Sequence, residues 1–139
     1  MRRPTLAVLC LLGGFSLACG GGDNNGGVEL PNQMSSNDHT HADKLLKPGE
    51  QIRAYYDATI ALNGNEAAMV TDQRVVYVID GRTTDIALAD VTAVDHTKDK
   101  LTGDVIDVHG TGGQRMRIEI APFNDGDLFV QILKEATGK

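Results

Sequence analysis

The chain lacks nucleophiles in the part that would fold. Its three serines are Ser16, Ser35 and Ser36, and its two cysteines are Cys10 and Cys19. Acyl transfer by the usual Ser or Cys constellations therefore has no attacking group beyond residue 36. A threonine nucleophile generally needs a free N-terminal amine, which lipidation of the mature N-terminus would remove. We therefore predict that the protein is not an enzyme and has neither a catalytic residue nor a cofactor.

Disulfides and cysteine metal sites are excluded for the same reason. A disulfide needs two thiols, and the chain after Cys19 contains none. Zinc sites built on thiolates are equally ruled out there. A secreted domain without disulfides must be stabilised by its hydrophobic core, and about 100 residues can bury enough surface for this.

Positive charge is scarce. All 19 Asp and Glu residues follow Cys19, whereas Arg2 and Arg3 precede it, which leaves 11 of the 13 Lys and Arg residues and a net charge of −8 in the remainder. Such an acidic surface repels phosphate backbones and anionic headgroups. We therefore exclude nucleic acid as a partner, and electrostatic docking to lipid headgroups as a mode of binding.

The start of the chain has the layout of a lipoprotein signal. Two arginines are followed by Leu6–Leu12, an apolar run too short to span a bilayer, which needs ~20 residues. Ser16–Cys19 (SLAC) resembles a lipobox, with Ser where the strict form has Leu. We predict a signal peptide over residues 1–18 and lipidation, including palmitate, at Cys19. The alternative is ordinary secretion with cleavage after Ala18.

A polar segment follows the predicted anchor. Gly20–Gly27 reads GGGDNNGG, which is typical of a flexible linker. We predict that residues 19–37 form the lipidated cysteine and a disordered tether. Gly20 at the second mature position resembles the form sorted to the outer membrane of Gram-negative bacteria. We therefore expect a lipid-anchored cell-envelope protein and, in a Gram-negative cell, the outer rather than the inner membrane.

Residues 38–139 are predicted to form one mainly β domain. Asp38–Leu46 favours a short helix, with Asp38 or Asn37 as its N-cap. Alternating apolar residues and turn dipeptides then predict seven antiparallel strands in a meander, over Gln51–Leu62, Glu66–Thr71, Arg74–Ile79, Thr84–Leu88, Val91–His96, Val105–His109 and Arg115–Ile120. An apolar stripe after Asn124-Asp125 predicts a C-terminal helix that ends at Gly138 and covers an open end of the sheets.

Three motifs in this region resemble bacterial pleckstrin-homology-like (PH-like) domains. They are Leu46–Glu50 (LKPGE), Val70–Val78 (VTDQRVVYV) and Ile86–Val94 (IALADVTAV). The resemblance extends from Leu45 to Glu135. It implies a partly open seven-stranded barrel, or orthogonal sandwich, of two sheets capped by the C-terminal helix.

The resemblance implies less about function, because this fold serves lipid, peptide and protein binding. Phosphoinositide binding needs cations in the first hairpin, and Asn63–Glu66 has none. Eukaryotic PH domains usually carry Trp in the terminal helix, whereas this chain has no Trp and offers Phe129 instead. Some bacterial relatives form symmetric oligomers.

One segment has the residue types of a metal site. Asp38–Asp43 contains His39, His41 and Asp43, and imidazole with carboxylate suits zinc or copper. The two imidazoles share a side only if the segment is extended; in a helix, His39 and Asp43 would share a face instead. The alternative is a solvated linker with incidental histidines.

Other polar residues have simpler explanations. Turn chemistry accounts for Asp95, Asp99 and Asp104, whose spacing does not match an EF-hand. We interpret His96 and His109 as surface residues of neighbouring strands.

The favoured function is therefore a membrane-anchored envelope lipoprotein. Its PH-like domain would act as a non-catalytic protein-binding or assembly module, contacting another protein or a second copy of itself. The alternative is a metal-binding or metal-responsive envelope protein acting through His39 and His41. No ligand-binding residue is identified by the sequence.

Overall fold

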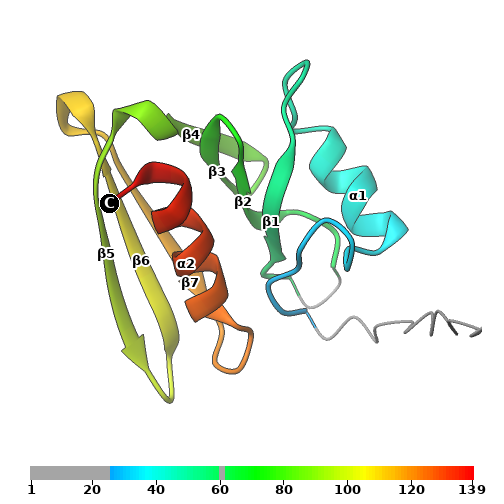
Figure 1. Cartoon of the computed structure of the whole chain (residues 1–139). Helices are drawn as coiled ribbons and strands as arrows, with labels where there is room; N and C mark the ends of the chain where they lie inside the picture. Colours follow the sequence, from blue (N-terminus) through cyan, green and yellow to red (C-terminus); the bar gives the residue numbers. More distant parts are fainter. Residues whose placement is uncertain (1–25, 60–61) are drawn as a thin grey trace, which may run out of the picture.

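The computed structural model describes residues 26–59 and 62–139. Two α-helices and seven strands account for most of this part of the chain (Figure 1). In chain order they are α1 (Ser36–Asp43), β1 (Ile52–Asp57), β2 (Glu66–Thr71), β3 (Arg74–Ile79), β4 (Arg82–Ala87), β5 (Val91–Asp99), β6 (Gly103–Gly110), β7 (Arg115–Ile120) and α2 (Gly126–Thr137). No helix among the described residues is long and apolar enough to cross a bilayer.

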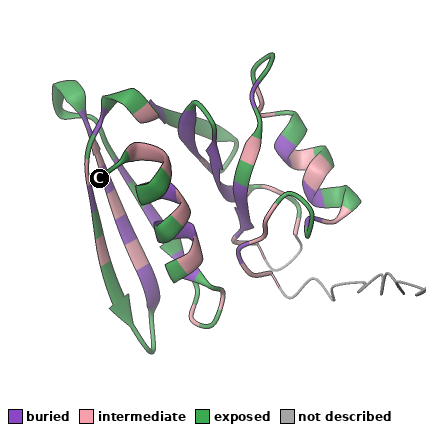
Figure 2. Cartoon of the chain, viewed as in Figure 1, coloured by how far each residue is buried: buried purple, intermediate pink, exposed green. Residues whose placement is uncertain are grey.

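The strands form two antiparallel sheets in simple meander order. One sheet has the order β1-β2-β3-β4 and the other β5-β6-β7, and α2 lies across the open side between them (Figure 1). The main core lies between the sheets and the apolar face of α2, where Phe129 and Leu133 are fully buried. Figure 2 shows this division, with the inner side of α2 buried and its outer side exposed. The predicted mainly β, open, helix-capped fold is confirmed.

A second, smaller core lies against the four-stranded sheet. Ala42 of α1 packs with Tyr55, Met69 and Val76, and Leu45 and Leu46 lie at its edge. Strands β1 to β3 are therefore covered on both faces and are buried along most of their length. This burial explains why Arg74–Ile79 is apolar on both sides, as expected of an interior strand.

The folded part begins earlier than predicted. Residues 26–37 were assigned to the disordered tether, yet Val28 and Met34 are buried at 5% and 8% exposure. Glu29 forms an antiparallel bridge with Tyr55 of β1, and the Val28 N–H donates to the Asn124 carbonyl at 3.0 Å. The tether prediction is therefore wrong for these residues. It followed the polar composition of the segment, in which Val28 and Met34 are isolated apolar residues. Residues 19–25 lie outside the described part.

The first helix is displaced from its predicted bounds. Its N-cap is Ser35, not Asn37 or Asp38, and the Ser35 hydroxyl accepts from the Asp38 N–H at 3.1 Å. Asp38 occupies the third helical position, and its Oδ2 accepts from the Ser35 hydroxyl, so the two residues are joined by two hydrogen bonds. The helix ends at Asp43 because Leu45 and Leu46 turn inward to the second core.

The first strand is shorter than its alternation predicted. Asp57 ends it: its Oδ1 accepts from the Thr59 N–H at 2.8 Å and its Oδ2 from the Gly64 N–H at 2.7 Å. This buried carboxylate organises a wide loop between β1 and β2 where a tight hairpin was predicted. Ile60 and Ala61, which that prediction placed in the strand, lie outside the described residues.

Candidate functional site

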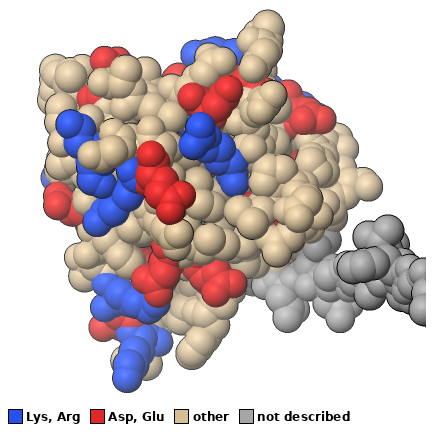
Figure 3. Space-filling model, in the orientation of Figure 1, with Lys and Arg blue, Asp and Glu red and all other residues tan. Residues whose placement is uncertain are grey.

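The candidate site is a hollow at one end of the three-stranded sheet. The turn between β5 and β6, the loop between β7 and α2, and the first turn of α2 surround a cavity of about 290 Å³. Pro122 and Phe123 give it an apolar wall, and the remaining lining consists of charged residues and two glycines, Gly103 and Gly126. Figure 3 shows basic and acidic side chains next to one another on the face of the molecule that includes this end.

Two large apolar side chains at this end are exposed. Phe123 is 97% exposed and Leu101, in the β5–β6 turn, is 88% exposed. Phe123 was not identified from the sequence, although an aromatic residue between Pro122 and Asn124 in a turn was the available signal. An aromatic side chain held in water in this way has no packing role within the described fold, so it is available to a partner.

The loop that carries Phe123 has an unusual backbone. Phe123 and Asp125 have φ angles of 68° and 56°, in the left-handed region that non-glycine residues seldom occupy. Asp125 is the N-cap of α2, but its side chain makes no capping hydrogen bond. Such strain costs about 1–3 kcal/mol per residue and persists only where the surroundings hold it. The loop shape is thus imposed by the fold.

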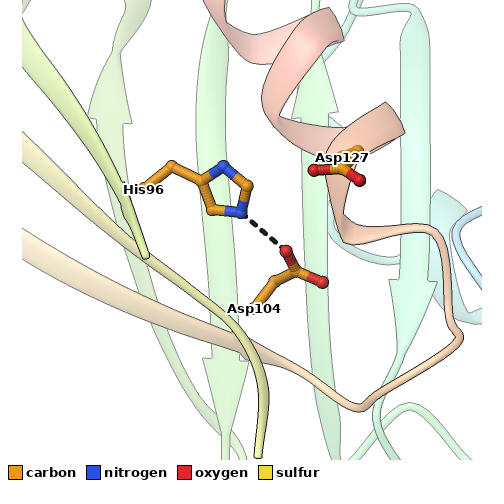
Figure 4. Close-up of side chains that lie close together, drawn as sticks. All are labelled: His96, Asp104 and Asp127. Carbon is orange, nitrogen blue, oxygen red and sulfur yellow. Dashed lines mark hydrogen bonds and ion pairs between the residues drawn. The ribbon is translucent and has the colours of Figure 1, made fainter. Parts of the chain in front are cut away.

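Three potential metal ligands meet at the edge of the same cavity. His96 of β5, Asp104 of β6 and Asp127 of α2 each place a ligand atom within 4.8 Å of the others (Figure 4). His96 Nε2 lies 2.6 Å from Asp104 Oδ1, and Lys98 forms an ion pair with Asp127. The sequence pattern predicted only a surface position for His96 and a turn for Asp104. The group could not be predicted because it depends on the fold. Asp104 of β6 lies near Asp127 of α2, which is 23 residues further along the chain.

Glycines allow this close approach. A Cβ atom at Gly126 would lie 2.4 Å from Asp104 Oδ2, and one at Gly103 would lie 2.1 Å from the Ile120 carbonyl oxygen. A larger residue at position 126 would force the start of α2 away from Asp104, and one at position 103 would collide with the backbone at the end of β7. The buried Asp104 carboxylate therefore depends on both glycines for its position.

The metal ligands predicted from the sequence are not brought together. His39 and His41 lie in α1, where two residues correspond to about 200° around the helix axis. His39 Nε2 lies 3.1 Å from the Pro31 carbonyl oxygen, whereas the His41 ring lies against Gly64 in the β1–β2 loop. Asp43 is exposed at the end of α1. Among the residues that the structure describes, the only group of three or more potential ligands is the one at His96.

The motif residues form a buried ionic cluster away from the cavity. Arg74 Nε and Nη2 donate to the two carboxylate oxygens of Glu50 at 2.6 and 2.9 Å, and the Thr71 hydroxyl donates to the same carboxylate at 3.1 Å. Hydrogen bonding to Arg74 lowers the pKa of Glu50 to about 2. Asp85, just before the third motif, adds an ion pair to Arg74 at 3.3 Å. Glu50, Thr71, Arg74 and Asp85 thus form one ionic cluster, which we call the clasp, that joins the first two motifs to the residue before the third.

A second buried polar cluster is less well satisfied. Tyr55 Oη and Asp38 Oδ1 are buried and have no hydrogen-bond partner among the described residues. They line a cavity of about 10 Å³ together with Glu29, which is room for about one water molecule. Burial and the neighbouring Asp38 raise the pKa of Glu29 to about 7.

The predicted lipidation site, Cys19, and the predicted signal peptide lie outside the described residues.

Comparisons with known proteins agree with the observed fold. Residues 46–135 match the family model for the bacterial PH domain. A crystal structure of a DUF1696 family protein with a pleckstrin-homology domain, from Shewanella loihica PV-4, is similar to this chain with a TM-score of 0.57 at 10% sequence identity. The similarity covers 81% of this chain and 98% of that one, and at this identity it shows the fold alone. No curated protein matches the chain.

Proposed function

This chain belongs to the bacterial PH domain family, and on that premise we propose that it is a non-catalytic protein-binding module of the cell envelope. The observation that carries the proposal is the pair of exposed apolar side chains at one end of the barrel, Phe123 and Leu101. The lack of Ser and Cys beyond residue 36 supports a role without covalent catalysis.

The site has the composition of a small protein interface. Aromatic side chains commonly serve as anchors that a partner buries, and Phe123 lies beside a cavity that could receive an apolar group in return. Four aspartates and two lysines line the cavity: Asp99, Asp104, Asp125, Asp127, Lys98 and Lys100. The surplus of negative charge favours a partner surface that carries lysine or arginine.

A lipid-headgroup role receives less support. The β1–β2 loop, where PH domains that bind phosphoinositides concentrate cations, contains Asn63, Gly64 and Asn65 before Glu66. The buried Asp57 carboxylate accepts hydrogen bonds from the backbone of this loop, and its negative charge would repel a phosphate. We therefore favour a protein partner.

Photocrosslinking tests the interface directly. We would place a photoreactive phenylalanine analogue at position 123 of the full chain and irradiate cells. Ile79, an apolar residue that is 44% exposed at the end of β3, provides a matched control position. We expect a discrete adduct from position 123 and none of that mass from position 79. Failure to obtain an adduct at 123, or the same adducts at both positions, would overturn the proposal; an adduct of twice the chain mass would identify the partner as a second copy.

Anchoring at Cys19 is the second part of the proposal. A lipid on Cys19 would hold the domain at the outer membrane through the polar segment that follows it. Replacing Cys19 by Ala should move the protein from the membrane fraction to the soluble fraction. A Cys10→Ala variant controls for loss of a thiol. Retention of Cys19→Ala in the membrane fraction would refute lipid anchoring without affecting the crosslinking result.

A further inference from the structure

We propose that His96, Asp104 and Asp127 bind a divalent transition-metal ion, with Zn²⁺ as the best fit. The three ligand atoms come from three different elements and lie within 4.8 Å of one another. Figure 4 shows His96 and Asp104 directed toward each other, with Asp127 facing them from the first turn of α2. This site is separate from the His39 and His41 pair.

The donor types select the class of metal. Imidazole nitrogen with carboxylate oxygen suits zinc and its neighbours, whereas Ca²⁺ takes six to eight oxygen ligands. Three protein ligands leave a fourth tetrahedral position open. Two of the ligands, Asp104 and Asp127, line the cavity of about 290 Å³. The open position has room for a water molecule or for a group from a binding partner.

The geometry needs little adjustment to accept an ion. Ligands about 2.0 Å from a tetrahedral zinc ion lie about 3.3 Å apart. The 2.6 Å contact between His96 Nε2 and Asp104 Oδ1 must therefore open by less than ~1 Å. Asp127 is 64% exposed at its side chain, so it can turn inward once the ion displaces the ammonium group of Lys98.

The buried carboxylate supplies an independent reason for a cation. The Asp104 side chain is only 5% exposed, and its Oδ1 bonds to His96. Asp104 also lines the cavity, so its carboxylate is within reach of an ion that enters there. A buried carboxylate needs a compensating positive charge, and an imidazole provides one only when doubly protonated. A bound metal ion would provide that charge with His96 neutral.

Zinc titration of the full chain in detergent tests the site. The chain has four histidines, so nitrogen-15 spectra of the imidazoles can follow each one separately. We expect binding of one Zn²⁺ per chain, with a shift of the His96 Nε2 resonance and no equal shift at His39, His41 or His109. Ca²⁺ should not compete.

Matched variants make the outcome specific. His96→Ala and Asp127→Asn should each weaken Zn²⁺ binding by about tenfold or more, since even outer partners of metal ligands contribute that much. His109→Ala is the control, because His109 also lies in a strand and bonds to an aspartate, Asp95, at 3.0 Å. Asp127 is exposed, so its variant should fold normally. Binding unchanged in both test variants, binding lost in His109→Ala, or no binding at all would overturn the proposal.

Discussion

Glu50 and Glu29 are both close to β1, yet their electrostatic surroundings are opposite. Glu50 faces a guanidinium that donates two hydrogen bonds, and its pKa falls to about 2. Glu29 faces a second carboxylate, Asp38, in a partly desolvated site, and its pKa rises to about 7. One carboxylate is therefore ionised at any physiological pH, whereas the other changes charge near neutrality.

The difference shows that one residue type can make either a contact that is independent of pH or one that changes with pH. The Glu50–Arg74 pair joins the lead-in to β1 with the start of β3, and every partner in it is satisfied. Around Glu29, by contrast, Tyr55 Oη and Asp38 Oδ1 lack partners. The first cluster thus joins β3 to the lead-in of β1 at any physiological pH, and we infer that the second makes the docking of residues 26–37 sensitive to protons.

Removing Arg74 from the clasp should have the largest effect on the stability of the fold. Arg74→Met leaves the buried Glu50 carboxylate without its counter-charge, and breaking such a pair typically costs about 3–5 kcal/mol. Urea denaturation should show a lower midpoint with little change in slope, which corresponds to a loss of unfolding free energy of this size. The double variant Glu50→Gln/Arg74→Met should recover part of the loss. A single variant as stable as the parent would show that the clasp has no structural role.

A smaller, pH-dependent effect is expected at Glu29. Because its pKa is higher in the folded chain than its ordinary 4.5, the folded state binds the proton more tightly. The resulting stability is complete below pH 4.5 and is lost as pH rises through about 7. Glu29→Gln should remove this decline, because the amide stays neutral. The free energy of unfolding at pH 8 should therefore be higher than that of the parent by on the order of 2 kcal/mol.

Thermal unfolding from pH 5 to pH 8 measures this comparison. Glu50 cannot supply the same slope, because its lowered pKa gives stability that is present above pH 4.5 and lost only as pH falls toward 2. Glu66→Gln is a control on the same sheet, since Glu66 accepts from the Tyr77 hydroxyl at 2.7 Å. A parent protein whose stability does not fall between pH 5 and pH 8 would contradict the assignment.

The smallest effect is expected at the rim of the clasp. Lys47 approaches Asp85 at 3.4 Å, but its side chain is 60% exposed. Exposed ion pairs contribute about 0–1 kcal/mol, so Lys47→Ala should shift the urea midpoint only slightly. A loss comparable to that of Arg74→Met would mean that the cluster extends to the surface.

Local sequence patterns predicted the sheets better than the sites. The clean alternation of Arg115–Ile120 and the β-prone run of Arg74–Ile79 gave strand bounds that match the structure. The PH-like motifs were recognised from their order, although nothing in them showed that Glu50, Thr71 and Arg74 would meet. Such contacts join residues more than 20 positions apart and depend on the finished fold.

The failures have the same physical origin. Glu29 was placed in a tether because its neighbours are polar, but its bridge to Tyr55 forms only when β1 is present. Helix α1 separates His39 from His41, whereas the packing of α2 brings Asp127 to His96 and Asp104. Phe123 was missed because exposure of one residue in a turn is a property of the whole surface.

The hydrogen bond from Val28 to Asn124 has a mechanical consequence. Val28 lies near the start of the described chain, and Asn124 adjoins Phe123 in the β7–α2 loop. With Cys19 anchored as proposed, tension along the chain would enter the domain at this contact and at the neighbouring Glu29–Tyr55 bridge. Both contacts would be loaded before the clasp around Arg74. A pull on the membrane anchor would thus reach the loop that presents Phe123 while the rest of the barrel remained intact.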